Sequence, residues 1–143
     1  MKTDLLIIGG GLAGLTAAYE VLKAEPGRRI TILRPGAGSS PYVHGFNMPL
    51  NPQDSTELFI RDTEASGRGQ GNAALVEELC RGSLELLPFF DELGLDFNRE
   101  ADGSYQQLRP LGASCPRVIS IGNDAGGAIL RKLLTAMEQH ENV

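Results

Sequence analysis

The sequence predicts an α/β fold built on a parallel β-sheet, because an apolar run, a glycine-rich turn and an apolar helix follow one another near its start. The run, residues 5–8, has the length and composition of a strand buried on both faces. Glycines then follow at Gly9, Gly11 and Gly14, in the order G-x-G-x-x-G. Good helix formers with an apolar face come next. This order of segments predicts a dinucleotide-binding βαβ unit of the Rossmann type.

The three glycines have different physical roles in such a unit. Gly9 permits the tight turn off the strand, Gly11 lets the backbone approach a pyrophosphate, and Gly14 lets the helix pack closely on the strand. The first helical residues, Leu12 and Ala13, present free N–H groups and the positive end of the helix dipole. We therefore expect nucleotide phosphates at this helix start, and the alternative is a glycine-rich turn that binds nothing.

A second strand is expected at residues 29–33, after the Pro26-Gly27 break. Many βαβ units place an acidic residue after this strand, where it binds the ribose hydroxyls. Here the position is held by Arg34, which is compatible with the 2′-phosphate of NADP. The ribose partner therefore stays open at this point.

Residues 35–52 form a long segment without helical or strand periodicity, rich in Gly, Pro, Ser and Asn. It leaves the carboxyl end of a strand, which is where doubly wound sheets bind their ligands. A ligand-binding loop and a plain surface loop are both compatible with this composition.

A helical insertion is predicted next. One helix is expected to start at Asp54, with Glu57 completing a capping box, and to end at Gly67. Asn72 is expected to cap a longer helix that Pro88 disturbs or ends. The buried side of that helix is expected to carry Leu75, Val76, Leu79, Cys80, Leu84 and Leu87.

The last third of the chain is predicted to hold short strands and a final helix. Residues 104–108 and 117–121 are the expected strands, and Asp102-Gly103 is a strong turn pair. Asn123 or Asp124 is expected to cap the helix. Its apolar, core-facing side should consist of Ile129, Leu130, Leu133, Leu134 and Met137.

Composition limits the classes of function. The 143 residues, 41% of them hydrophobic, suit one globular domain, and a net charge of -5 argues against nucleic acid or an anionic membrane as the main partner. No apolar run approaches the roughly 20 residues that cross a bilayer, and the N-terminus does not resemble a signal peptide. Cys80 and Cys115 lack metal-like spacing, so we expect reduced thiols in a cytoplasmic protein and no metal site. Cys115 has no histidine nearby in sequence, so nucleophilic catalysis is not expected of it.

The chain as a whole resembles the succinate dehydrogenase and fumarate reductase flavoprotein family, which includes L-aspartate oxidase. The resemblance is carried, in order along the chain, by GGGLAGLTAA, ITILRPGAGSS, YVHGFN, Asp62-Thr63-x-x-x-Gly67, ELGLDF and SCPRVISIGNDAGGAIL. It implies a Rossmann-type domain that binds FAD, and hydride transfer between a small dicarboxylate and the flavin.

The resemblance also implies which residues bind the cofactor. By resemblance the set includes Gly9, Gly11, Gly14, Ser39, Ser40, His44 and Gly45. Leu12 and Ala13 of the helix start and Arg34 after the second strand complete the candidate cofactor-binding residues. The histidine that tethers FAD covalently in some members aligns with Ser39, so noncovalent FAD is expected. Where members commonly have an alanine-glutamine-glycine-glycine run, this chain has Val43-His44-Gly45-Phe46, which implies altered flavin contacts. No residue matches the proton donor or the substrate arginines of the family, so no catalytic residue is assigned. The family histidine that precedes the match to Arg117 is also replaced, by Cys115-Pro116.

Against full-length members, residues 1–143 correspond to the N-terminal part of the FAD-binding domain, incomplete at the C-terminus and without the capping domain. We therefore expect no turnover by this chain alone, and an exposed sheet edge that a second chain or a second copy covers. The alternatives are a non-catalytic nucleotide-binding or assembly module and, less expected, an NAD(P)-binding domain.

Overall fold

The computed structural model describes residues 2–141, which form two compact units. The first unit consists of residues 2–44 and 124–141, and the second of residues 45–123. The first contains β1 (Leu5–Ile8), α1 (Leu12–Ala24), β2 (Ile30–Leu33), the 3-10 helix η1 (Ser40–Tyr42) and α5 (Ala125–Glu138). The second contains β3 (Phe46–Asn47), α2 (Thr56–Ser66), α3 (Ala73–Gly82), the 3-10 helix η2 (Ser83–Glu85), α4 (Leu86–Glu92) and β4 (Val118–Ile119). No helix within residues 2–141 is long and apolar enough to cross a bilayer.

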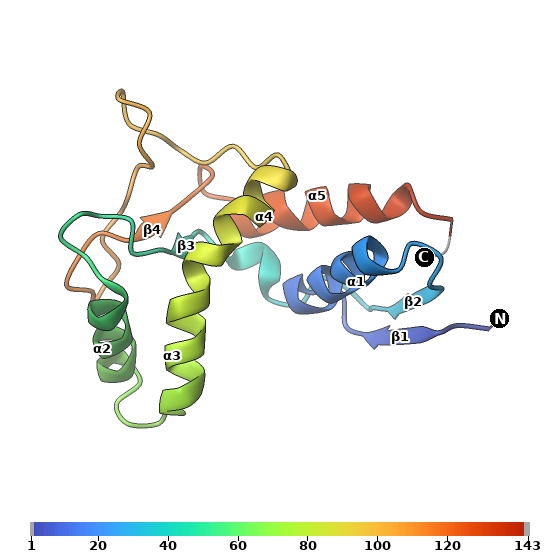
Figure 1. Cartoon of the computed structure of the whole chain (residues 1–143), viewed down its shortest axis with the longest axis horizontal. Helices are drawn as coiled ribbons and strands as arrows, with labels where there is room; N and C mark the ends of the chain where they lie inside the picture. The colour runs from blue at the N-terminus through green and yellow to red at the C-terminus, as the bar shows by residue number, and fades with distance from the viewer. Residues whose placement is uncertain (1, 142–143) are drawn as a thin grey trace. The chain divides into compact units, whose positions relative to one another are not determined.

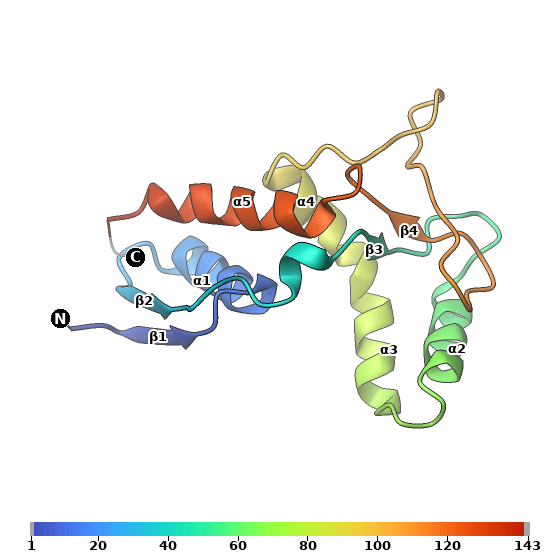
Figure 2. The ribbon, with the colours of Figure 1, turned by 180° about the vertical axis from the view of Figure 1, so that it is seen from behind.

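The first unit is the predicted βαβ unit with α5 added to it. β1 and β2 pair in parallel, with Leu5 opposite Ile30. Both ribbon views show α1 lying between these strands and α5 (Figures 1 and 2). Ala18 of α1 is fully buried, and its small side chain lets the packed elements approach closely. The core-facing side predicted for the last helix is confirmed at Ile129, Leu130, Leu133 and Met137, which are all buried.

The other face of the two-stranded sheet is exposed. Leu6, Ile8 and Leu33 are 49%, 82% and 53% exposed, so the prediction of a first strand buried on both faces is wrong. The reason is that the helices lie on one side of the strands, and neither view shows a described segment of this unit on the other side (Figures 1 and 2). Parallel sheets are normally covered on both faces, so we expect another segment or chain to pack against this apolar face.

The first helix of the second unit, α2, is capped by a different residue from the predicted one. Ser55 is its N-cap and accepts a hydrogen bond from the Leu58 amide at 3.1 Å. The predicted capping box of Asp54 and Glu57 is therefore wrong, because the Asp54 side chain is drawn into the interior by an ion pair. The predicted cap of α3 is confirmed, since Oδ1 of Asn72 accepts from two amides of the first turn.

The predicted long helix after Asn72 consists of α3, η2 and α4. Pro88 lies inside the first turn of α4, where the missing N–H has no helical partner to lose. Cys80 is fully buried, as predicted, but Leu75 and Leu79 are 63% and 62% exposed. Leu84 is also exposed, so the predicted buried stripe is wrong at three of its members. The helix breaks after Gly82, and the stripe therefore does not face one continuous core.

An aromatic cluster forms the core of the second unit next to α4. The ring of Phe90 lies 5.0 Å from that of Phe46 and 5.1 Å from that of Phe97, measured between centroids. Tyr105 joins at the edge of Phe97. The side chain of Phe46 is thus occupied in packing the core.

The strands of the second unit are shorter than predicted. Of residues 117–121, Val118–Ile119 form β4, which pairs antiparallel with β3 from the loop at 35–52. Residues 104–108 contribute isolated bridges, at Tyr105 and Leu108, in place of a strand.

Candidate functional site

The glycine turn between β1 and α1 has the backbone geometry that the sequence predicts. Gly9 has φ +117, a value that L side chains rarely adopt, and its N–H donates to the carbonyl of Leu33 on β2. A Cβ built on Gly14 would overlap the carbonyl oxygen of Gly9 and lie 3.1 Å from the Ile7 side chain. The first glycine therefore makes the turn, and the third permits close packing of helix on strand.

Gly10 has a role that the sequence reasoning missed. A Cβ on Gly10 would overlap the side chain of Arg34 and lie 3.0 Å from the carbonyl oxygen of Gly36. The parallel pairing of β1 and β2 thus brings Arg34 over the glycine turn. Three consecutive glycines where the motif requires only two were the signal in the sequence that could have indicated this close approach.

Ser40 supplies the side-chain cap that α1 lacks. The N-cap of α1 is Gly11, which has no side chain to offer. The Leu12 amide donates to Oγ of Ser40 at 2.9 Å, across 28 positions of sequence. A Cβ on Gly11 would lie 3.0 Å from the same Oγ. The long loop after β2 therefore returns to the start of α1 and places a hydroxyl there. The expectation of a free N–H at Leu12 is thus wrong, because Ser40 already accepts it.

The other residues implied by the resemblance fall in different places. Ser39 is exposed and precedes η1, and His44 is exposed at the end of the same segment. Gly45 belongs to the second unit, where a Cβ would lie 2.5 Å from the Ile119 carbonyl oxygen and 2.6 Å from the Val118 side chain. Close packing against β4 therefore explains why position 45 is a glycine, independently of any cofactor.

The residues at the start of α1 fit a pyrophosphate. The helix is 13 residues long, and its first turn contains no acidic residue that would neutralise the positive end of its dipole. The absent Cβ of Gly11 leaves room for Oγ of Ser40, which places a hydroxyl at the start of the helix. Arg34 lies against the glycine turn and adds positive charge. This arrangement can bind and orient phosphates, and it contains no group placed for proton transfer.

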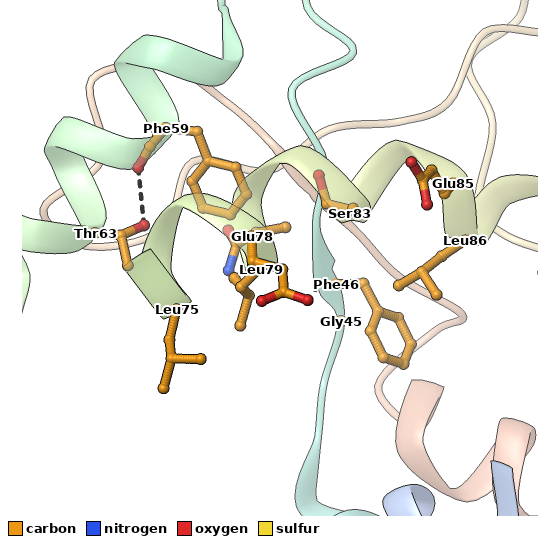
Figure 3. A pocket seen from close by; sticks show the side chains of 12 residues that line it. Gly45, Phe46, Phe59, Thr63, Leu75, Glu78, Leu79, Ser83, Glu85 and Leu86 are labelled. Atoms are coloured by element: carbon orange, nitrogen blue, oxygen red, sulfur yellow. Dashed lines mark hydrogen bonds between the residues drawn. The ribbon is translucent and has the colours of Figure 1, made fainter. Parts of the chain in front are cut away.

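The second unit contains an open, largely apolar groove of about 920 Å³ (Figure 3). Residues of β3, α2, α3, η2 and α4 line it, including Phe59 of α2, Leu75 and Leu79 of α3, and Phe46 of β3. Thr63 also reaches the groove, and its hydroxyl donates to the carbonyl of Phe59 at 2.8 Å. The groove explains where the exposed leucines of α3 lie: they form one of its walls.

Arg117 is committed to ion pairs inside the second unit. Its guanidinium bonds both carboxylate oxygens of Asp54, at 2.8 and 2.9 Å, and lies 2.8 Å from Asp62. It also stacks over the Phe59 ring at 4.9 Å. Burial lowers the pKa of Arg117, but the two carboxylates outweigh burial and raise it. The side chain is thus fixed by structural partners.

The two cysteines are buried, unlike reactive thiols, which are exposed to solvent. Cys80 is fully buried, and burial raises the pKa of its thiol, as expected of a core residue. Cys115 is 8% exposed, and its Sγ donates to the carbonyl of Gln53 at 3.4 Å. Neither has the exposure of a catalytic nucleophile.

Comparison with known proteins identifies the family. Residues 4–143 match the model of the FAD binding domain family. L-aspartate oxidase of Xylella fastidiosa is 30% identical over 133 residues, which cover 92% of this chain and 26% of that protein. An uncharacterised FAD-dependent oxidoreductase of Methanocaldococcus jannaschii is 33% identical over 145 residues, which cover 100% of this chain and 27% of the relative. The chain therefore spans about a quarter of the length of the curated relatives it matches.

Solved structures share the fold. E. coli quinol fumarate reductase FrdA superposes with a TM-score of 0.89 at 23% identity, covering 99% of this chain and 25% of that one. A flavocytochrome c3 fumarate reductase gives a TM-score of 0.79 at 23% identity, with 99% of this chain and 26% of that chain covered. The chain belongs to the FAD binding domain family, whose members include L-aspartate oxidase and an FAD-dependent oxidoreductase and whose cofactor is FAD.

Proposed function

We propose that the chain binds FAD noncovalently, with the pyrophosphate at the start of α1. The observation that carries this proposal is the meeting of Gly11, the Leu12 amide and the Ser40 hydroxyl at one helix end that has no acidic residue in its first turn. A pyrophosphate there would receive backbone N–H groups, a hydroxyl and the helix dipole together.

Each predicted site residue has a part in this proposal. Gly9 and Gly14 shape the turn, and the amides of Gly11 and Ala13 would hold the phosphates. Leu12 would contribute through Ser40, whose hydroxyl accepts the Leu12 amide. Arg34 and Ser40 contact the phosphate and ribose end, while Ser39, His44 and Gly45 lie along the segment that leads to the flavin ring. Bound FAD supplies the capacity to accept or give a hydride. The residues of this chain bind and orient it, and none acts as the proton donor.

For the complete protein, we propose a flavin-dependent oxidoreductase that passes a hydride between a small dicarboxylate and the flavin. Names of the relatives, L-aspartate oxidase and fumarate reductase, support this class of substrate. Residues 1–143 would form the N-terminal part of its FAD-binding domain. Alone they would bind cofactor without turning over substrate, because no residue of the chain matches the proton donor or the substrate arginines of the resembled family.

The exposed sheet face supports a partner. Leu6, Ile8 and Leu33 present three large aliphatic side chains on one face of β1 and β2. A second chain or a second copy that covers them would bury the apolar surface that parallel sheets normally hide. The free thiols Cys80 and Cys115 support a reducing, cytoplasmic setting for the assembly.

A titration with FAD tests the proposed cofactor site. The absorbance spectrum of the purified protein, followed by acid release of any bound small molecule, shows whether FAD is carried and whether it is noncovalent. Quenching of FAD fluorescence then compares the original chain with Gly11→Val, which should abolish binding because its side chain meets Ser40 and the pyrophosphate. Gly27→Val is the matched control, because a Cβ on Gly27 meets nothing within 4 Å. Equal affinity of Gly11→Val and Gly27→Val would place the phosphate site elsewhere.

A further inference from the structure

The 3-10 helix η1 is held between the first turns of α1 and α5. On the α1 side, Ser40 accepts the Leu12 amide at 2.9 Å. On the α5 side, the Gly126 amide donates to the carbonyl of Val43 at 2.7 Å. Figure 2 shows this turquoise turn next to the beginnings of both helices. One short segment therefore links the start of α1 to the start of α5.

The contact with α5 requires a glycine. A Cβ on Gly126 would overlap the backbone carbonyl oxygen of Ser40 and would lie 3.0 and 3.1 Å from Cβ and the carbonyl oxygen of Val43. These are mostly backbone atoms, which cannot rotate away. Gly126 is itself buried, so η1 has no room to accommodate a larger residue without moving.

Gly127, the next residue, has a different environment. A Cβ there would meet the carboxylate of Asp124, which is the end of a side chain that is 54% exposed and can turn into solvent. The two adjacent glycines thus differ in what they touch: Gly126 touches the backbone of η1, and Gly127 touches a movable side chain.

We propose that Gly126 is a positioning residue for FAD: its missing Cβ lets η1 rest on α5 at the depth that keeps the Ser40 hydroxyl at the Leu12 amide. This inference rests on the proposed function, since it concerns the same phosphate site. It makes FAD affinity depend on a residue of α5 that lies 86 positions after Ser40 in the sequence and does not contact the cofactor itself.

The experiment compares Gly126→Ala with Gly127→Ala in the whole chain. FAD affinity is measured by fluorescence quenching, and the Leu12 amide is followed in 15N-resolved NMR spectra without FAD. Gly126→Ala should weaken FAD binding about tenfold or more, the size of one lost hydrogen bond to a charged group, and should shift the Leu12 resonance. Gly127→Ala should leave both unchanged.

A double-mutant cycle separates positioning from general loss of structure. Once Ser40→Ala has removed the hydroxyl, adding Gly126→Ala should cost little further affinity, because the group that Gly126 positions is gone. Additive losses would mean that Gly126 acts on the fold alone, and they would overturn the inference. Equal affinities of Gly126→Ala and Gly127→Ala would also overturn it, while leaving the proposed function intact. An original chain that takes up no FAD would overturn the proposed function and this inference with it.

If Gly126→Ala fails to fold, amide exchange in the original chain gives the answer. Release of η1 breaks the Leu12 and Gly126 hydrogen bonds together, so both amides should exchange with the same opening free energy. Clearly different opening free energies would show that the two contacts are independent, and would overturn the inference.

Discussion

Arg117 and Asp54, 63 residues apart in sequence, form a bidentate ion pair whose side chains are 1% and 0% exposed. Asp54 precedes the N-cap of α2, and Arg117 precedes β4. The pair therefore connects an early segment of the second unit to a late one. Asp62 on α2 completes the cluster from the other side of the guanidinium. Because the charges are buried, removing either partner would leave the other as an unpaired charge inside the protein.

Replacing Arg117 with Met should destabilise the chain by about 3–5 kcal/mol, because the Asp54 carboxylate would stay buried without its partner. Urea unfolding followed by circular dichroism measures this loss. The control is Arg81→Met, which removes an arginine paired with Glu77 and Glu57 at the surface and should cost far less stability than Arg117→Met. Similar losses of unfolding free energy for the two variants would show that burial of the ion pair does not set its contribution to stability.

Acid should destabilise the second unit partly through Asp62. Burial acts to raise the pKa of Asp62, but hydrogen bonds from Ser114 and the charge of Arg117 outweigh it and lower the pKa below its ordinary value. The folded chain then binds fewer protons than the unfolded chain, so this stabilisation is complete above a pH of about 4 and is lost as pH falls through the folded pKa. Asp62→Asn should therefore show a shallower loss of unfolding free energy below a pH of about 4 than the original chain. Parallel curves would contradict the assignment.

The exposed leucines of α3 should tolerate polar replacement. Leu79→Gln should change the unfolding free energy by less than about 0.5 kcal/mol, because the side chain is 62% exposed. Leu133→Ala on α5 is the contrasting variant, and it should cost about 2–5 kcal/mol, because Leu133 is fully buried. A large loss for Leu79→Gln in chemical unfolding would mean that another segment covers the groove.

The open sheet face should mediate association. Ile8→Lys should shift the chain toward monomer, or release it from its partner, because a charge would replace an aliphatic side chain on the surface to be covered. Light scattering after size-exclusion chromatography measures the mass. Leu111→Lys is the control, since Leu111 is fully exposed on a loop of the second unit. A stable monomer before any substitution would contradict the need for a second copy.

Sequence alone determined the parts of this protein that depend on neighbouring residues. The run at residues 5–8, the glycine motif and the apolar face of α1 predicted the βαβ unit, because strand length, turn chemistry and helical periodicity are local properties. The Asn72 cap followed from the same kind of information. The order of motifs also indicated the flavoprotein family that the comparisons establish.

Only the tertiary structure decided which distant residues meet. The place of Ser40 at the Leu12 amide and the burial of Asp54 with Arg117 depend on how a long loop and two short strands fold back, over 28 and 63 positions. The same holds for Leu75 and Leu79, whose spacing predicts burial although α3 leaves them on an open groove. Periodicity identifies an apolar face, but the neighbour that covers it is set by packing between segments far apart in sequence.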